Sequence, residues 1–135
     1  MAMKIEDIEG IGPKYGKILR DNGINSPAKL LSTCANPSGR KELENKTGMS
    51  HSHILRWVNL ADLCRVKGVS TQYSELLEAA GVDSVKELRN RNAENLTEKM
   101  KEVNASKKLV RSVPSGKLVA DWVSQAKAMA PVITY

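Results

Sequence analysis

The amino-acid sequence predicts an all-α fold built from short helices, and three observations predict it. Apolar residues recur at helical spacing along most of the chain. Strand-like alternation of apolar and polar residues never runs longer than about four residues. Helix-capping residues precede many of the apolar stretches, and glycines follow two of them. Together these signals leave little room for a sheet.

The first half of the chain contains four helix starts. Pro13 follows a pair of glycines and fixes the first turn of a helix there. Ser26 and Asn36 each precede a proline, so each is expected to cap a helix that begins at that proline. Ser50 is the expected cap of a longer helix that continues to Arg65 without a proline or glycine.

The second half carries the same kinds of signal. Ser70 and Gly81 frame a helix over residues 71–80. Ser84 with Glu87 three residues later forms a capping box, which predicts another helix start. Gly23 follows an apolar helical stretch in the first half as Gly81 does in the second, which predicts a left-handed C-terminal residue at both.

An internal repeat relates the two halves. Residues 8–30, shifted by 58 positions, fall on residues 66–88 with Gly, Tyr, Leu, Gly, Ser and Leu coinciding. At a slightly longer shift Trp57 falls on Trp122. Both tryptophans lie on apolar helix faces and are predicted to anchor cores. We therefore expect two units, residues 1–62 and 63–135, packed as one rigid body because the predicted helix over residues 50–65 joins them without a break.

The clearest local motif surrounds the first glycines. Gly10 and Gly12 can adopt backbone dihedrals that other residues avoid, between a short helix and the one that Pro13 begins. Gly16 is small where these two helices would cross closely. This pattern resembles the helix-hairpin-helix motif. The resemblance implies that backbone N–H groups of the turn and of the following helix N-terminus hold a phosphate oxygen of DNA.

The chain as a whole resembles the family catalogued as domain of unknown function 4332, a tandem helix-hairpin-helix family. The similarity extends from residue 5 to about residue 126. It rests on the strings IEGIGPKY at residues 8–15, GRKEL at 39–43, WVNLADL at 57–63, LLEAAGVD at 76–83 and DW at 121–122. The resemblance implies the fold and says little about the activity.

Three further turns of this kind are more degenerate. Ser70 and Ser50 replace the second glycine in two of them, and the turn over residues 112–115 has no glycine. Such loss is typical of copies retained for packing. We therefore expect phosphate binding to be the exception among these copies.

The turn with the more complete glycine pattern is not the turn with the more favourable charge for an anion. Acidic and basic residues cancel around the first turn, where Glu9 directly precedes Gly10, whereas Arg65 and Lys67 dominate the second. Residues 99–117 hold the densest basic stretch, with Glu102 its one acidic residue. This stretch is either a surface that follows a duplex or simply a solvated helix face and turn.

The composition narrows the class of protein. Lysine and arginine total 21 against 15 acidic residues, so the net charge of +6 permits an anionic partner without requiring one. With five aromatic residues and no phenylalanine, an aromatic platform for single-stranded nucleic acid is not expected. No apolar run approaches the ~20 residues of a membrane span, and the acidic N-terminal segment does not resemble a signal peptide. Cys34 and Cys64 are expected to be reduced thiols in a cytoplasmic protein.

No pattern of a catalytic, metal or cofactor site is present. The glycines at positions 10, 12 and 16 are one residue off the dinucleotide-binding fingerprint, and the residues around Lys17 do not match a phosphate-binding P-loop. His51 and His53 are two apart, so they cannot share one helix face as a metal-ligand pair. We expect neither an enzyme nor a bound cofactor or metal.

Two functions are the main hypotheses, and the charge alone also allows a third, shape-based binding of structured RNA, which no motif supports. The first is a non-catalytic module that binds the DNA backbone weakly and without sequence preference. The second is a protein-interaction or scaffold module in which the turns are only tight helix connectors, with a protein partner in place of DNA. The sequence predicts no oligomeric state. The expected nucleic-acid contacts are Gly10, Ile11, Gly12, Lys14 and Lys17 in the first turn, Lys67, Gly68 and Ser70 in the second, and Lys107, Lys108 and Arg111 in the basic stretch.

Overall fold

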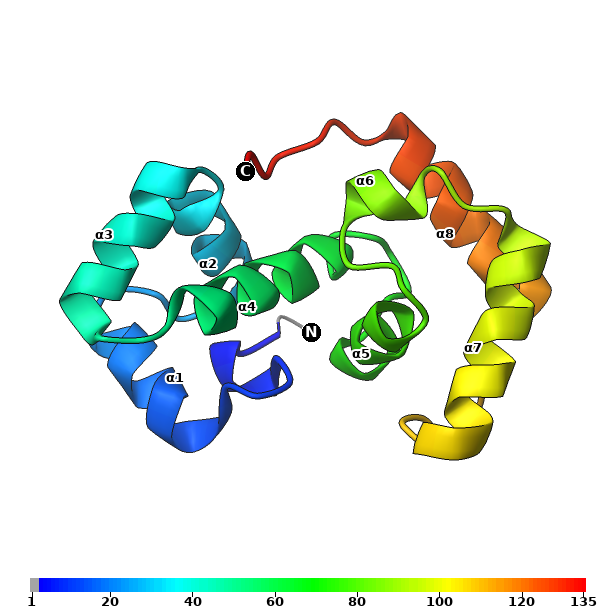
Figure 1. Ribbon diagram of the computed structural model, residues 1–135, viewed down its shortest axis with the longest axis horizontal. Helices are drawn as coiled ribbons and strands as arrows, with labels where there is room; N and C mark the ends of the chain where they lie inside the picture. Colours follow the sequence, from blue (N-terminus) through cyan, green and yellow to red (C-terminus); the bar gives the residue numbers. More distant parts are fainter. Residues whose placement is uncertain (1–2) are drawn as a thin grey trace. The chain divides into compact units, whose positions relative to one another are not determined.

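The computed structural model describes residues 3–135, and all of its regular structure within that range is helical (Figure 1). The all-α prediction is therefore confirmed. The elements in chain order are η1 (Ile5–Asp7), α1 (Gly12–Asp21), α2 (Pro27–Cys34), α3 (Pro37–Thr47), α4 (His51–Leu63), α5 (Thr71–Ala79), α6 (Val85–Leu88), α7 (Ala93–Lys107) and α8 (Gly116–Ala128).

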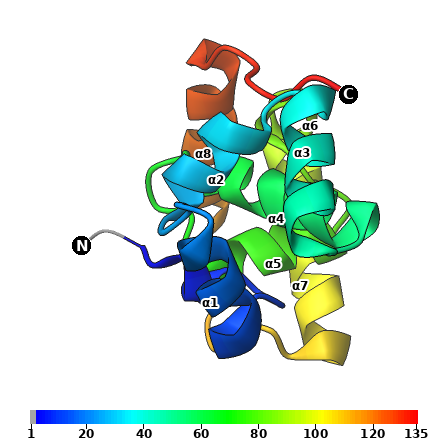
Figure 2. The same ribbon diagram turned by 90° about the vertical axis from the view of Figure 1, so that its left-hand side faces the viewer.

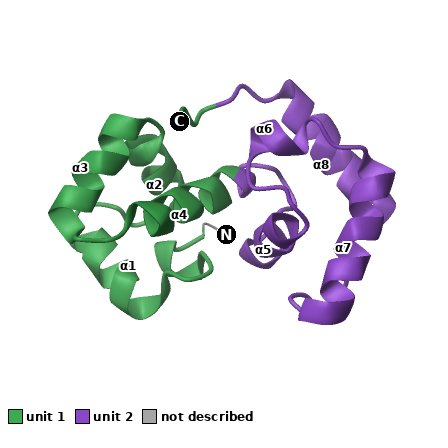
Figure 3. Ribbon diagram, viewed as in Figure 1, with its two compact units in different colours: residues 1–62, 132–135 green, residues 63–131 purple. Residues whose placement is uncertain are grey.

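The chain divides into two compact units, each with its own apolar core (Figure 3). Unit 1 runs to Asp62 and also contains Val132–Tyr135, while unit 2 is Leu63–Pro131. Trp57 lies in the core of unit 1 with 1% of its surface exposed, and Trp122 in the core of unit 2 is fully buried. The two tryptophans are core anchors, as the sequence predicts.

Unit 1 contains η1 and the helices α1 to α4, of which α1, α2 and α3 face the viewer in Figure 2. Ser26 and Asn36 cap α2 and α3 by accepting hydrogen bonds from backbone N–H groups three residues later. The Oγ of Ser50 accepts from the N–H of His53 in the same way at the start of α4. All three caps were expected, because serine and asparagine oxygens satisfy the unpaired N–H groups of a first helical turn.

Unit 2 contains α5 to α8, with α7 and α8 packed side by side (Figures 1 and 3). Ser70, Ser84, Asn92 and Ser115 cap the four helices in turn. The capping box expected at Ser84 is only half formed. The carboxylate of Glu87 pairs with Arg91 instead of returning to the backbone of Ser84.

Helix α4 ends two residues earlier than the sequence predicts, at Leu63 instead of Arg65. The N–H of Val66 bonds the carbonyl of Leu63, and the N–H of Val69 bonds the carbonyl of Val66. These tight turns replace the helical pattern and direct the chain into residues 66–70. The apolar periodicity extends past this point because Val66 and Val69 are buried without being helical.

Other predictions concern single residues. Gly23 and Gly81 both have positive φ, +81° and +96°, directly after their helices, as expected of left-handed C-terminal positions. Cys34 and Cys64 are free thiols, the first fully buried and the second half-buried. Burial raises the pKa of the Cys34 thiol to about 11 and raises that of Cys64 as well, so both favour the protonated form.

None of the helices within residues 3–135 combines the length and apolarity that crossing a membrane would require.

Candidate nucleic-acid interface

The first turn, residues 8–12, joins η1 to α1 through two left-handed glycines. Gly10 has φ +90° and Gly12 has φ +60°, conformations that cost other residues free energy. Between them Ile11 faces inward with 2% of its surface exposed, and its N–H bonds the carbonyl of Ile8. The turn therefore presents backbone at its surface while its isoleucines belong to the core.

Helix α1 begins without a side-chain cap. Its N-cap residue is Ile11, which has no oxygen to offer, and Pro13 follows within the first turn. Each of the other α-helices in the described residues has a serine or asparagine oxygen at this position. The first turn of α1 thus keeps its positive dipole end without an oxygen acceptor from a capping side chain.

The two lysines expected beside this turn are both exposed. The Nζ of Lys14 lies 5.9 Å from the ring centroid of Tyr15. The Nζ of Lys17 pairs with Asp21 at 3.2 Å, and the side chains keep 79% and 64% of their surface exposed. Such exposed pairs contribute about 0–1 kcal/mol, so Lys17 can exchange Asp21 for another anion at little cost.

One of the three acidic residues near the first turn, Glu6, is held in an ion pair. The Nε and Nη2 of Arg20 donate to the carboxylate of Glu6 at 2.6 and 2.7 Å. The guanidinium hydrogen bond lowers the pKa of Glu6 to about 2. Glu6 also crosses directly over Gly16, where an added Cβ would lie 2.5 Å from the Glu6 Cγ. The close crossing expected at Gly16 is confirmed, and Glu9 is left as an exposed carboxylate beside Gly10.

Each unit supports its turn with a tryptophan, and in unit 1 the Nη1 of Arg56 adds a contact, 3.1 Å from the position of a Cβ on Gly10. A Cβ added at Gly10 would lie 3.2 Å from the Nε1 of Trp57, and one added at Gly68 would lie 3.0 Å from the Nε1 of Trp122. The ring of Tyr15 is 5.3 Å from Trp57, and that of Tyr73 is 5.4 Å from Trp122, at interplanar angles of 52° and 54°. A glycine, a tryptophan and a tyrosine thus pack together in both units, at positions that the sequence repeat relates.

The second turn, residues 66–70, differs in how its polar groups are used. Gly68 has φ +95°, but the position of the second glycine is held by Ser70, whose Oγ accepts from the N–H of Tyr73. The side chain of Gln125 holds the backbone of Lys67 from both sides, accepting from its N–H at 2.8 Å and donating to its carbonyl at 3.0 Å. Two backbone donors of this segment are therefore already paired within unit 2.

The basic stretch covers the end of α7, the start of α8 and the loop between them, residues 108–115, which we call the basic loop. The amide of Asn104 pairs with both the N–H and the carbonyl of Val110 at 3.0 Å, and the hydroxyl of Tyr73 donates to the carbonyl of Ser112 at 3.2 Å. Lys108 ends α7 in the left-handed conformation, with φ +52°. A hollow of about 810 Å³ lies here, lined by Gln72, Asn104 and residues 108–111.

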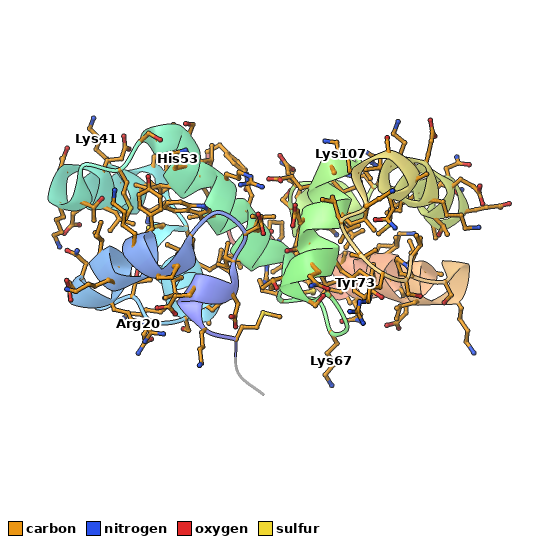
Figure 4. The ribbon with its side chains drawn as sticks, turned by 90° about the horizontal axis from the view of Figure 1, so that it is seen from below. Arg20, Lys41, His53, Lys67, Tyr73 and Lys107 are labelled. Carbon is orange, nitrogen blue, oxygen red and sulfur yellow. The ribbon has the colours of Figure 1, made fainter. Side chains whose placement is uncertain are left out.

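The structure does not gather all the expected contacts of unit 2 on one face. Lys107, Lys108 and Arg111 are exposed within or next to the loop. Lys67 lies on the opposite side of unit 2 from Lys107 (Figure 4). The second turn and the basic loop therefore form two separate cationic surfaces of that unit.

Sequence reasoning missed the two side chains that fix these segments, Gln125 and Asn104. Gln125 lies 58 residues from the backbone that it holds, and no local pattern announces such a contact. Asn104 stands four residues before the left-handed Lys108, so an asparagine in a last helical turn was a signal that could have been used.

No cluster of three or more potential metal-ligating side chains occurs in the described part of the chain. His51 and His53 are exposed at the start of α4, and His53 stacks against Trp57 with 5.6 Å between ring centroids.

Comparison with known proteins places the chain in one family. A family model described as a domain of unknown function, DUF4332, matches residues 9–129. No curated protein and no solved structure matches the chain.

Proposed function

We propose that this chain, which belongs to the DUF4332 family of domains of unknown function, is a non-catalytic module of tandem helix-hairpin-helix repeats. In this proposal it binds the DNA phosphate backbone weakly and without sequence preference. Contacts of this kind position a protein on a duplex without reading its bases.

The observation that carries the proposal is the uncapped start of α1. Two left-handed glycines bring the backbone of the first turn to the surface, and no side-chain oxygen covers the helix N-terminus behind them. A phosphate oxygen is an acceptor of the charge and size that such a helix start favours. Lys14 and Lys17 lie in the first two turns of α1, and both side chains are exposed.

The matching arrangement of glycine, tryptophan and tyrosine in the two units supports the tandem repeat. Because Gly68 and Trp122 repeat the contact between Gly10 and Trp57, both turns are supported alike. Only the first turn leaves its helix without a cap, so we assign the main phosphate contact to it. The basic loop of unit 2 adds favourable long-range charge.

Binding is expected to be weak because the first turn is close to electrically neutral. Glu6 pairs with Arg20 and Lys17 with Asp21, and the remaining exposed charges near the turn, Lys4 and Lys14 against Asp7 and Glu9, cancel. Affinity then depends on the hydrogen bonds of the helix N-terminus and on the net charge of +6.

Fluorescence anisotropy with a random-sequence duplex, a matching single strand and an RNA hairpin tests this proposal at several salt concentrations. Contact with a few phosphates predicts a linear fall of log affinity with log salt, with a slope of about −2 to −5. The preferred ligand identifies the class of nucleic acid. Absence of binding at about 50 mM salt and tens of micromolar protein contradicts the proposal.

The second candidate, a protein-interaction module, is favoured by the pairing of the second turn within its own unit. Ser70 and Gln125 occupy donors that a ligand would otherwise use, which suits a structural connector. This function predicts an exposed apolar patch or a stable oligomer, together with no salt-dependent binding to DNA. Light scattering over a concentration series, together with the anisotropy titration, separates the two candidates.

A further inference from the structure

The last four described residues, Val132–Tyr135, belong to unit 1 although they follow unit 2 in sequence. We call them the return segment. The N–H of Thr134 donates to the carbonyl of Ala35 at 2.8 Å, and the Nη2 of Arg40 donates to the carbonyl of Thr134 at 2.7 Å. Both backbone groups of the same residue are therefore held by unit 1.

One apolar side chain of the return segment, Ile133, is buried in unit 1, whereas Tyr135 keeps 66% of its surface exposed and contacts unit 1 from its surface. Ile133 is 9% exposed and belongs to the core of unit 1, while Val132 is 38% exposed. The hydroxyl of Tyr135 donates to the Oδ1 of Asn59 at 2.7 Å, and its ring lies 5.8 Å from the guanidinium of Arg40. Extended peptides are recognised by main-chain hydrogen bonds together with pockets for side chains, and here Thr134 supplies the former while Ile133 fills the latter.

The groove that receives this segment is costly to leave empty. Arg40 is 2% exposed, and its Nη1 donates to the carbonyls of Cys34 and Ala35 at the end of α2. Its Nε has no hydrogen-bond partner. Withdrawal of the return segment removes the acceptor of Nη2 as well and opens the apolar space that Ile133 fills. A buried cation with fewer partners and an empty apolar pocket both disfavour the vacant groove.

We propose that the groove of unit 1 is a recognition site for the return segment of a second copy of this chain, as well as for its own. The contacts just described are made by Ile133, Thr134 and Tyr135, so a segment from another copy reproduces them. The chain between α8 and the segment is residues 129–131, which are not helical. Two copies that exchange segments fill both grooves, which closes the assembly as a symmetric dimer.

The first experiment tests recognition between separate molecules. A fluorescent peptide of residues 130–135, acetylated and amidated so that its ends carry no charge, is titrated into full-length chains carrying Ile133→Asp or Val132→Asp. Ile133→Asp frees the groove, whereas Val132→Asp is the matched control at a more exposed position. We expect binding to the Ile133→Asp chain at least about tenfold tighter than to the control, whose own segment competes at an effective concentration of about millimolar.

A peptide with aspartate in place of Ile133 is expected not to bind. Failure of the unchanged peptide to bind a folded Ile133→Asp chain at about 1 mM overturns the proposal. If circular dichroism shows that this chain is not folded, it is replaced by a full-length chain with Tyr135→Phe, which lacks the hydroxyl that donates to Asn59.

The second experiment tests whether the return segment of a second copy occupies the groove. Wild-type protein is refolded at high concentration, diluted, and measured at once by multi-angle light scattering. We expect a dimer fraction that grows with refolding concentration in the wild type and in Val132→Asp and is absent in Ile133→Asp. A monomer in all three proteins, or equal dimer in Ile133→Asp, overturns exchange between copies. These outcomes are independent of DNA binding, which uses other residues.

Discussion

The two glycine turns, residues 8–12 and 66–70, are supported by equivalent tryptophans and differ in whether the helix that follows is capped. In both, a left-handed glycine packs against the indole nitrogen of a buried tryptophan, and a tyrosine ring covers that tryptophan. Around the second turn, Ser70 caps α5 and Gln125 holds the backbone of Lys67. The first turn has Gly12 at the position of Ser70 and no cap on α1.

This difference shows that the packing that supports a turn and the pairing of its backbone donors depend on different residues. Apolar packing fixes the path of the backbone, and it is the same in the two units. One or two polar side chains then decide whether the donors at the helix start are paired within the protein. In the proposed function, both turns are therefore equally important for stability, and only the first is assigned the binding of an anion. The following predictions test this separation, from the largest expected effect to the smallest.

Replacing either tryptophan by alanine is expected to lower the free energy of unfolding by about 3–5 kcal/mol, because it empties a large buried space. Trp57→Ala and Trp122→Ala are compared by urea unfolding, with the exposed Lys99→Ala as the control. A large loss for one tryptophan and a negligible loss for the other contradicts the equivalence of the two supports.

Alanine at Gly10 or Gly68 is expected to cost more than alanine at Gly12. All three positions have positive φ, which costs about 1–2 kcal/mol for a residue with a Cβ. Only at Gly10 and Gly68 would the Cβ also crowd a tryptophan, whereas nothing lies within 4 Å of one at Gly12. Gly116→Ala is the control, at a helical position without positive φ. Thermal unfolding that ranks Gly12→Ala as the most damaging of the three refutes the proposed role of the tryptophans.

Ser70→Gly is expected to make the second turn more like the first. It removes the side-chain oxygen from the start of α5, at a cost of a few tenths of a kcal/mol in stability. A free helix N-terminus contributes about 0.3–1 kcal/mol to anion binding, so duplex affinity should rise about two- to fivefold at low salt. Anisotropy titrations of this variant and of Ser115→Gly, at the start of α8, measure the effect. If Ser115→Gly raises the duplex affinity as much as Ser70→Gly does, the gain in affinity is not specific to the second turn.

The ion pair between Glu6 and Arg20 gives the first turn a dependence on pH. Glu6 has a pKa of about 2 in the folded protein against 4.5 for a free glutamate, so folding favours its charged form. The pair therefore stabilises the protein above pH 4.5, and this stabilisation is lost as the pH falls through about 2. The melting temperature of Glu6→Gln should lie below that of the wild type at pH 7 and should converge with it near pH 2. If the difference in melting temperature between Glu6→Gln and the wild type is as large at pH 2 as at pH 7, the stabilisation does not come from the charged form of Glu6.

Local signals allowed much of the fold to be predicted. The caps at Ser26, Asn36 and Ser50 and the left-handed glycines at positions 23 and 81 each depend on residues within four positions. The exact end of α4 was missed because Val66 and Val69 continue the apolar pattern from a non-helical turn.

Contacts between distant residues could not be predicted from the sequence. Gln125 reaches Lys67 across 58 positions, and Arg40 reaches Thr134 across 94. A glutamine on a helix surface and an arginine in a short helix have many partners available, and only the packed units select one. For the candidate site, the sequence identified the glycines and lysines of the first turn, but the internal pairing of the second turn required the structure.

The most direct test of the central claim is the DNA affinity of two charge-matched variants of unit 1. Lys14→Glu with Lys17→Glu alters the first turns of α1, while Lys29→Glu with Lys41→Glu makes the same change in net charge on α2 and α3. Lys41 lies at the opposite edge of unit 1 from Arg20 of α1 (Figure 4). Anisotropy with a random-sequence duplex at low salt should show binding abolished in the first variant and retained in the second, with circular dichroism unchanged in both. Equal loss in the two variants, or binding that survives Lys14→Glu with Lys17→Glu, contradicts the account.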